Sequence, residues 1–165
     1  SDKRFFLETS IKGLKKKFMA LNEVVIHSGD IAQLIEYEVF IDDVFVYKQK
    51  ADGLIISSPT GSTGYSLSSG GPIVHPKVNS LVLSPMLPLS LSSSSLVIDA
   101  ESKVKVILAK SSRSAQLSFD SNSSLILKKG GEINVCKSNS FLELIHPKGN
   151  DFFGACRNKL RWSTH

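Results

Sequence analysis

Short runs of apolar and β-branched residues recur along the whole chain, and turn-forming residues separate them. From Ile35 the sequence alternates between apolar and acidic side chains, and after a turn at Asp42 and Asp43 residues 44–50 alternate back, which predicts a hairpin. We expect strands at residues 5–11, 18–26, 32–41, 44–50, 54–57, 80–83, 96–98, 103–108, 115–119, 125–127, 132–136 and 141–145. Many short strands with regular turns are typical of a mainly-β domain, a layered β-sandwich, and one short helix is expected at residues 65–69.

The composition is that of an ordinary globular domain. The chain has 165 residues, of which 41% are hydrophobic and 21% charged, enough for one domain with its own core. No apolar run reaches the ~18 residues of a membrane helix, and the first residues carry no signal-peptide core. We therefore expect no membrane contact and a cytoplasmic location. The two cysteines, Cys136 and Cys156, fit a reducing compartment better than a disulfide framework.

The net charge of +5 suits an anionic ligand. The basic residues do not alternate with aromatic ones along one face, so we expect no nucleic-acid binding. The run of lysines at residues 15–17 is interpreted as a solvated strand edge. His27, His75 and His146 are not spaced with carboxylates as metal ligands are, so no metal site is predicted in this chain.

A loop rich in hydroxyl groups and glycines follows the apolar run at residues 54–56. Between Ser57 and Gly64, serine, threonine and glycine dominate, and glycine lets backbone N–H groups approach a ligand closely. Tyr65 then supplies an aromatic face, and Pro72 ends any helix that begins near it. This pattern predicts a polar pocket of nucleotide size at the end of a strand.

Three long blocks resemble the C-terminal domain of NAD kinases, in that family's order and spacing. They are residues 20–27 (ALNEVVIH), 51–68 (ADGLIISSPTGSTGYSLS) and 70–76 (GGPIVHP). The resemblance extends over essentially the whole chain. It implies transfer of the γ-phosphoryl group of ATP, or of polyphosphate, to the adenosine ribose 2′-hydroxyl of NAD, giving NADP. It also implies Mg²⁺ or another divalent cation with ATP, a two-domain subunit, and a homodimer or homotetramer.

The resemblance also implies residue roles. Asn22 and Glu23 match the family's Asn-Glu pair, which holds the NAD adenosine and ribose. A carboxylate such as that of Glu23 can accept hydrogen bonds from two ribose hydroxyls. Asp52 matches a carboxylate that reaches a dinucleotide across a subunit interface. The adenine-side wall is matched by Thr60, Thr63, Gly64 and Tyr65, with Ser68 near it.

The chain departs from the family pattern in three places. Gly64 stands where alanine is commoner, and Asn122 stands where the triplet that begins at Asp120 usually ends in glutamine. The Gly-Gly-Asp-Gly phosphate loop and the catalytic aspartate are absent, because they belong to the family's N-terminal domain. We therefore expect no catalytic residue in this chain and no activity from it alone. Residues 1–149 are expected to form the dinucleotide-binding and oligomerising sandwich, and residues 150–165 a tail that packs on the N-terminal domain.

Two other functions fit parts of the pattern. The chain could be a stand-alone dinucleotide-binding module without kinase chemistry, or the second domain of a lipid kinase of the diacylglycerol-kinase type. The Asn22-Glu23 pair and the block from Thr60 to Tyr65 favour NAD over a lipid, because a lipid site should show a larger apolar groove.

Overall fold

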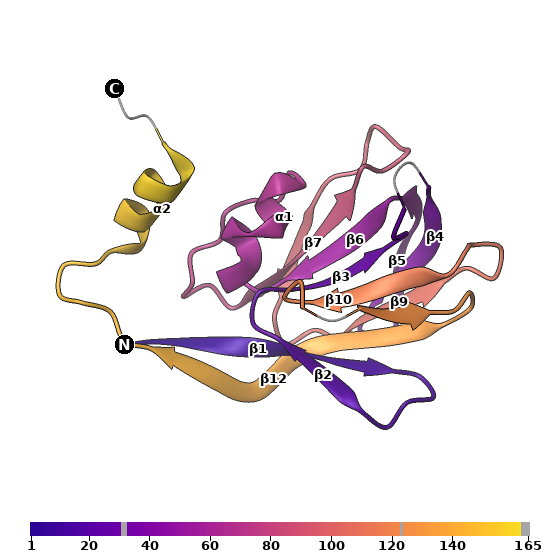
Figure 1. Cartoon of the computed structure of the whole chain (residues 1–165), viewed down its shortest axis with the longest axis horizontal. Coiled ribbons are helices and arrows are strands. Elements are labelled where there is room, and N and C mark those ends of the chain that lie inside the picture. Colours follow the sequence, from indigo (N-terminus) through magenta and orange to yellow (C-terminus); the bar gives the residue numbers. More distant parts are fainter. Residues whose placement is uncertain (31–32, 123, 163–165) are drawn as a thin grey trace.

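Two antiparallel sheets pack face to face in the computed structural model, which describes residues 1–30, 33–122 and 124–162 (Figure 1). In these ranges each sheet has six strands. The first sheet has the order β2-β1-β12-β9-β4-β5 and contains β1 (Asp2–Ile11), β2 (Lys17–Ala20), β4 (Ile35–Ile41), β5 (Val44–Ala51), β9 (Val104–Leu108) and β12 (Glu132–Leu144). The second has the order β11-β10-β3-β6-β7-β8 and contains β3 (Glu23–His27), β6 (Gly53–Ser57), β7 (Ser80–Met86), β8 (Leu96–Asp99), β10 (Ala115–Phe119) and β11 (Ser124–Leu127). The predicted mainly-β layered fold is confirmed.

The core lies between the two sheets. Strand β4 buries every second residue over most of its length, as its alternating sequence predicts. The largest fully buried side chains come from both sheets and include Leu7, Ile35, Leu108, Ile133, Ile26, Leu54, Leu83 and Leu117. Each contributes about 1.5–3 kcal/mol when removed from water. The hydroxyl of Tyr37 in β4 donates to the carbonyl of Gly53 in β6 at 3.2 Å, so one buried hydrogen bond joins the two layers.

Three of the expected strands differ from the observed ones in more than their exact ends. Residues 18–26 were expected to form one strand, which is wrong, because the chain turns at Leu21 and Asn22 and passes from β2 in the first sheet to β3 in the second. Separate strands at residues 132–136 and 141–145 are also wrong, because β12 runs from Glu132 to Leu144. It pairs with β1 on both sides of a register shift, which absorbs the polar residues 138–140 as an irregularity within the strand. Strand β4 begins at Ile35, and residues 31–32 lie outside the described ranges.

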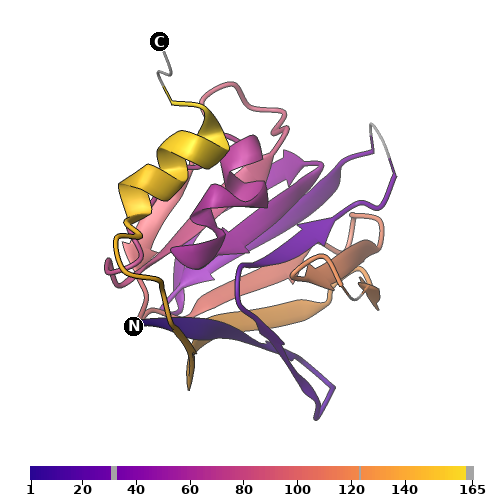
Figure 2. The same cartoon turned by 60° about the vertical axis from the view of Figure 1, so that its left-hand side comes forward.

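Three helical segments lie at one end of the sandwich in the described ranges (Figure 2). The predicted short helix is α1 (Tyr65–Ser68), and the 3-10 turn η1 (Thr60–Thr63) precedes it. The third segment, α2 (Phe152–Leu160), was not predicted as a helix. The Asp151 side chain caps α2 by accepting from the N–H of Gly154 at 2.6 Å.

The tail contacts the sandwich through aromatic rings. The ring centroids of His75 and Phe152 lie 4.9 Å apart, and those of His75 and Phe153 lie 5.7 Å apart. Cys156 is buried, but Phe153 is 55% exposed and Trp162 is 41% exposed. The division into residues 1–149 and a tail at 150–165 stays a prediction. Among the described residues, no helix combines the length and the apolar character needed to cross a membrane.

Candidate functional site

The turn between β2 and β3 is fixed by a carboxylate from a distant part of the chain. Asp120 follows β10, and its Oδ2 accepts from the N–H of Leu21 at 2.6 Å. Its Oδ1 accepts from the N–H groups of Asn22 at 2.7 Å and of Glu23 at 3.2 Å. Asp120 adopts φ 51°, the left-handed conformation that aspartate tolerates in turns. Sequence reasoning missed this positioning role, and the turn residues that follow β10 were the available signal.

The glycine- and serine-rich loop packs directly on this turn. The Ser58 N–H donates to the carbonyl of Asn22 at 2.9 Å, and the Ser58 hydroxyl donates to the carbonyl of Leu21 at 2.6 Å. Gly61 lies so close that a Cβ at this position would overlap the backbone of Asn22. Asn22 and Glu23 are therefore held from two sides, by Asp120 and by the loop.

The hydroxyl groups of this loop divide into two sets. Ser62 and Ser66 are fully buried and bonded within the fold: the Ser62 hydroxyl donates to the carbonyl of Pro59 at 2.7 Å, and the Ser66 hydroxyl lies 3.2 Å from that of Ser84. The predicted site residues with hydroxyl groups form the other set, because Thr60 is half-buried and Thr63, Tyr65 and Ser68 are exposed; Gly64 between them is exposed too. The small serines thus shape the loop, and the outward residues are available to a ligand.

Glu23 carries a buried carboxylate oxygen without a hydrogen-bond donor. The residue is 4% exposed, and none of the described residues donates to its Oε2. Burial, and then the negative charge of Asp120, raise the pKa of Glu23 above its usual range. A Cβ on Gly64 would lie 3.5 Å from this oxygen, so the loop passes directly over it. A buried acceptor without a partner is costly, and hydroxyl groups of a ligand would satisfy it.

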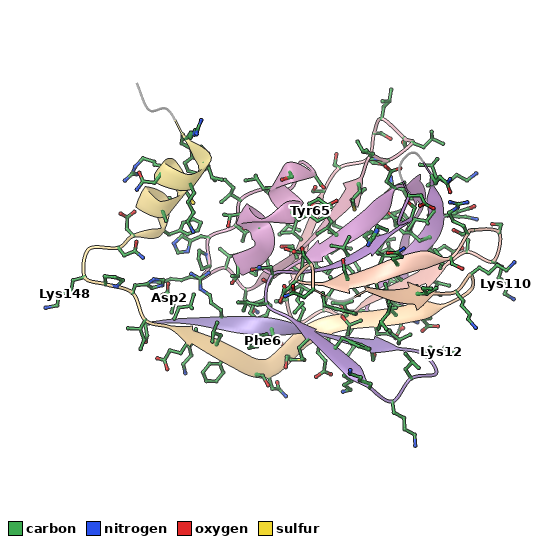
Figure 3. All side chains as sticks on the ribbon, viewed as in Figure 1. Asp2, Phe6, Lys12, Tyr65, Lys110 and Lys148 are labelled. Atoms are coloured by element: carbon green, nitrogen blue, oxygen red, sulfur yellow. The ribbon has the colours of Figure 1, made fainter. Side chains whose placement is uncertain are left out.

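Four of the predicted residues line one cavity of about 600 Å³ between the loop and α2: Asn22, Thr60, Thr63 and Gly64. The opposite wall comes from α2, through Phe152, Ala155 and Cys156. Tyr65 lines a second hollow, of about 380 Å³, on the outer face of β3 and β10 with His27, Ser118 and Asn122. Figure 3 places Tyr65 at α1, beside the strands of the second sheet. The neighbouring residues Gly64 and Tyr65 therefore line two different hollows.

Asp52 lies apart from this cluster. It precedes β6, whereas Ser57 at the other end of β6 pairs with Glu23. At ~3.3 Å per residue, five residues of strand separate Asp52 from Ser57 by about 16 Å. The backbone of Asp52 is bonded to Met86 and Ser28, at 2.9 and 3.0 Å. Within one chain the structure does not bring Asp52 to Asn22 and Glu23.

Metal-binding side chains do not gather at the site. In the ranges that the structure describes, no three His, Cys, Asp or Glu side chains are arranged to hold a metal ion. Glu23 and Asp120 are neighbours, but Asp120 is engaged by three backbone N–H groups. The residues that the structure describes therefore do not form a Mg²⁺ site.

The structure thus defines a mainly-β domain of two packed sheets, with a pocket of nucleotide size at one end between the loop and α2. The model of the ATP-NAD kinase C-terminal domain family matches residues 21–147. The chain belongs to this family, and the resemblance noted in the sequence is confirmed.

Individual relatives of this chain are named NAD kinases. NAD kinase of Saccharophagus degradans is 44% identical over 169 residues, which cover 100% of this chain and 58% of the relative. NAD kinase of Wigglesworthia glossinidia brevipalpis is 47% identical, covering 98% of this chain and 56% of the relative. The chain therefore spans a little over half the length of these relatives.

Solved structures share the fold. Yeast NADH kinase complexed with NADH has a TM-score of 0.89 at 30% identity, covering 98% of this chain and 49% of that one. An NAD kinase from Archaeoglobus fulgidus in complex with ATP has a TM-score of 0.77 at 29% identity, covering 94% of this chain and 61% of that one. These relatives are NAD or NADH kinases, and none of those named here is a lipid kinase.

Proposed function

We propose that this chain is the NAD-binding part of an NAD kinase, which transfers the γ-phosphoryl group of ATP, or of polyphosphate, to the adenosine ribose 2′-hydroxyl of NAD. The observation that carries the proposal is the buried, unpartnered Oε2 of Glu23 beneath Gly64. Ribose hydroxyls are donors of the kind that this oxygen lacks. The family membership and the NADH-bound relative support the same ligand class.

Each residue has a proposed role in binding. Asn22 and Glu23 hold the adenosine ribose, and Asp120 keeps their backbone in place through its three hydrogen bonds. The wall beside the adenine consists of Thr60, Thr63, Gly64, Tyr65 and Ser68. Because phosphoryl transfer depends mainly on positioning and charge stabilisation, this chain contributes the position of the acceptor hydroxyl.

The phosphoryl-transfer groups are proposed to lie outside these 165 residues. The chain matches a little over half the length of its relatives, and we expect it to form no NADP from NAD and ATP by itself. A divalent cation such as Mg²⁺ would accompany the ATP phosphates, as this ion commonly does. The described residues offer no cluster of side chains that would hold this ion.

We further propose a homo-oligomer, a dimer or a tetramer, in which Asp52 approaches the pocket of a neighbouring subunit. The position of Asp52, at the other end of β6 from Ser57 and Glu23, supports this arrangement, because Asp52 lies outside the cluster of proposed pocket residues in its own chain. The cytoplasmic location stays a prediction, which the free cysteines Cys136 and Cys156 support.

Calorimetric titration of NAD and NADP into the wild-type chain and a Glu23→Ala variant tests the proposed function. Loss of a charge-assisted acceptor should weaken binding by about 1.5–3 kcal/mol, or roughly tenfold to more than a hundredfold. Glu143→Ala is the matched control, since Glu143 is an exposed carboxylate on β12 that does not line the cavity. Equal affinities for wild type and Glu23→Ala would refute the assignment.

A further inference from the structure

A buried arginine borders the cavity between the loop and α2. Arg4 lies on β1, and its side chain is only 11% exposed. Figure 3 shows the start of β1, marked by Asp2, at the end of the sandwich that carries α2. Arg4 lines the cavity together with Asn22, Thr60 and Thr63, so a cation faces the same space as Asn22 of the proposed ribose-binding pair.

The hydrogen-bond donors of Arg4 are poorly used. Its Nη1 donates to the Thr60 hydroxyl at 3.3 Å, and its Nη2 approaches the Asp2 carboxylate at 3.5 Å. Its Nε is buried, and none of the described residues accepts a hydrogen bond from it. A guanidinium has five N–H donors in a planar fork. Two long contacts leave most of that capacity unused in a position where water is largely excluded.

The other charged groups around Arg4 do not complete its coordination. Asp2 is shared, because its Oδ2 also lies 3.2 Å from Nε2 of His146. Asp151 is occupied as the cap of α2, and Lys159 on α2 adds a further positive charge to the cavity lining. A buried cation with long, partial pairing favours an additional anion, and the arginine fork matches a phosphate group in two places.

We propose that Arg4 binds a phosphate group of the dinucleotide in the cavity between the loop and α2. The inference rests on the proposed function, because it places the ribose at Asn22 and Glu23 and its phosphate toward Thr60 and Arg4. Two phosphates carry this chemistry: the pyrophosphate that NAD and NADP share, and the 2′-phosphate that only NADP carries. Arg4 is a binding residue in this account and takes no part in proton transfer.

Arg4 could instead serve only to position Thr60 through their hydrogen bond. The two roles differ in the ligands they affect. A positioning role would weaken binding of adenosine, which touches the loop but has no phosphate. A phosphate-binding role leaves adenosine unaffected and weakens the phosphorylated ligands.

The test is calorimetric titration of adenosine, NAD and NADP into the wild-type chain, Arg4→Gln and Arg4→Lys. The control is Arg113→Gln, because Arg113 is an exposed arginine with a 3.8 Å ion pair to Asp30, outside this cavity. We expect Arg4→Gln to lose about tenfold or more in NADP affinity, with adenosine affinity and the control unchanged. The NADP affinity of Arg4→Lys should lie between those of wild type and Arg4→Gln, since lysine keeps the positive charge but not the planar set of donors.

The ligands that lose affinity in Arg4→Gln show which phosphate group Arg4 binds. Equal losses for NAD and NADP identify the pyrophosphate, and a loss for NADP alone identifies the 2′-phosphate. Unchanged NAD and NADP affinities in Arg4→Gln, or an equal loss for adenosine, would overturn the proposal. If Arg4→Gln does not fold, the same comparisons apply to Arg4→Lys.

A separate measurement with inorganic pyrophosphate tests the phosphate site independently of the proposed function. Inorganic pyrophosphate should raise the thermal midpoint of the wild-type chain and leave that of Arg4→Gln unchanged. If wild type binds no dinucleotide but shows this pyrophosphate effect, the proposed function fails and the phosphate site stands. If pyrophosphate stabilises both chains equally, or neither, the phosphate site is refuted.

Discussion

Replacing Gly61 by alanine should dislodge the turn that carries Asn22 and Glu23. An added Cβ would overlap the carbonyl oxygen, the carbonyl carbon and the Cα of Asn22. All three are backbone atoms, so no rotamer change can relieve the contact. Either the loop or the turn must move, and Asp120 opposes movement of the turn through three hydrogen bonds.

The expected cost combines two terms. Forcing a methyl group into a closely packed position costs about 1–3 kcal/mol. Loss of the two short hydrogen bonds from Ser58 to Leu21 and Asn22 adds about 0.5–1.5 kcal/mol each. We therefore expect Gly61→Ala to lower the free energy of unfolding by roughly 2–6 kcal/mol, with a loss of NAD affinity in the molecules that stay folded.

The same loop provides the control. A Cβ at Gly64 would lie 3.2 Å from the carbonyl oxygen of Gly61 and 3.5 Å from Oε2 of Glu23, and the φ of Gly64 is −98°. Gly64→Ala should therefore change stability by less than about 1 kcal/mol. Urea denaturation of both variants makes the comparison. Equal midpoints for Gly61→Ala and Gly64→Ala would refute the packing argument.

Three further predictions concern the same end of the sandwich. Burial, and then the charge of Asp120, raise the pKa of Glu23 in the folded chain above its value in the unfolded chain. Deprotonation of Glu23 is therefore less favourable in the folded chain. The free energy of unfolding falls as pH rises from the unfolded-state pKa to the folded-state pKa. Glu23→Gln should gain stability over wild type as pH rises above the usual titration range of a glutamate, and a difference in urea midpoints that does not change with pH would contradict this. Asp120→Asn removes part of an acceptor set for three N–H groups and should cost about 2–4 kcal/mol, measured by the same denaturation. Asp151→Ala removes the cap of α2 and should cost about 1 kcal/mol, seen as faster amide exchange in α2, whereas the exposed Asn158→Ala should leave exchange nearly unchanged.

The alternating segments of this chain predict their own structure, because side-chain pattern and burial share one period. Strand β4 and its partner β5 are examples, and their turn at Asp42 and Asp43 falls where expected. The break between β2 and β3 could not be found locally. Leu21 and Asn22 are not turn-forming as a pair, and the carboxylate that bends the chain there lies at residue 120.

The candidate site, too, was only partly predictable from the sequence. The motif at Asn22 and Glu23 and the loop from Thr60 to Tyr65 indicate which residues belong together, and the structure brings most of them to one end of the sandwich. Sequence could not tell buried serines such as Ser62 from outward threonines, because both types carry hydroxyl groups. The unpartnered oxygen of Glu23 depends on packing from Gly64, which no local pattern encodes.

An NMR titration of NAD into the isotope-labelled chain, following backbone amide shifts, tests the proposed binding site most directly. We expect the largest changes on the turn at Asn22 and Glu23 and on residues 60–65. The amide signal of Asp52 should change together with those signals only if the chain self-associates. Light scattering on the same sample measures that self-association. Changes confined to another surface, such as the hollow between β5 and the loop at residues 89–94, or no changes at saturating NAD, would contradict the proposed binding site.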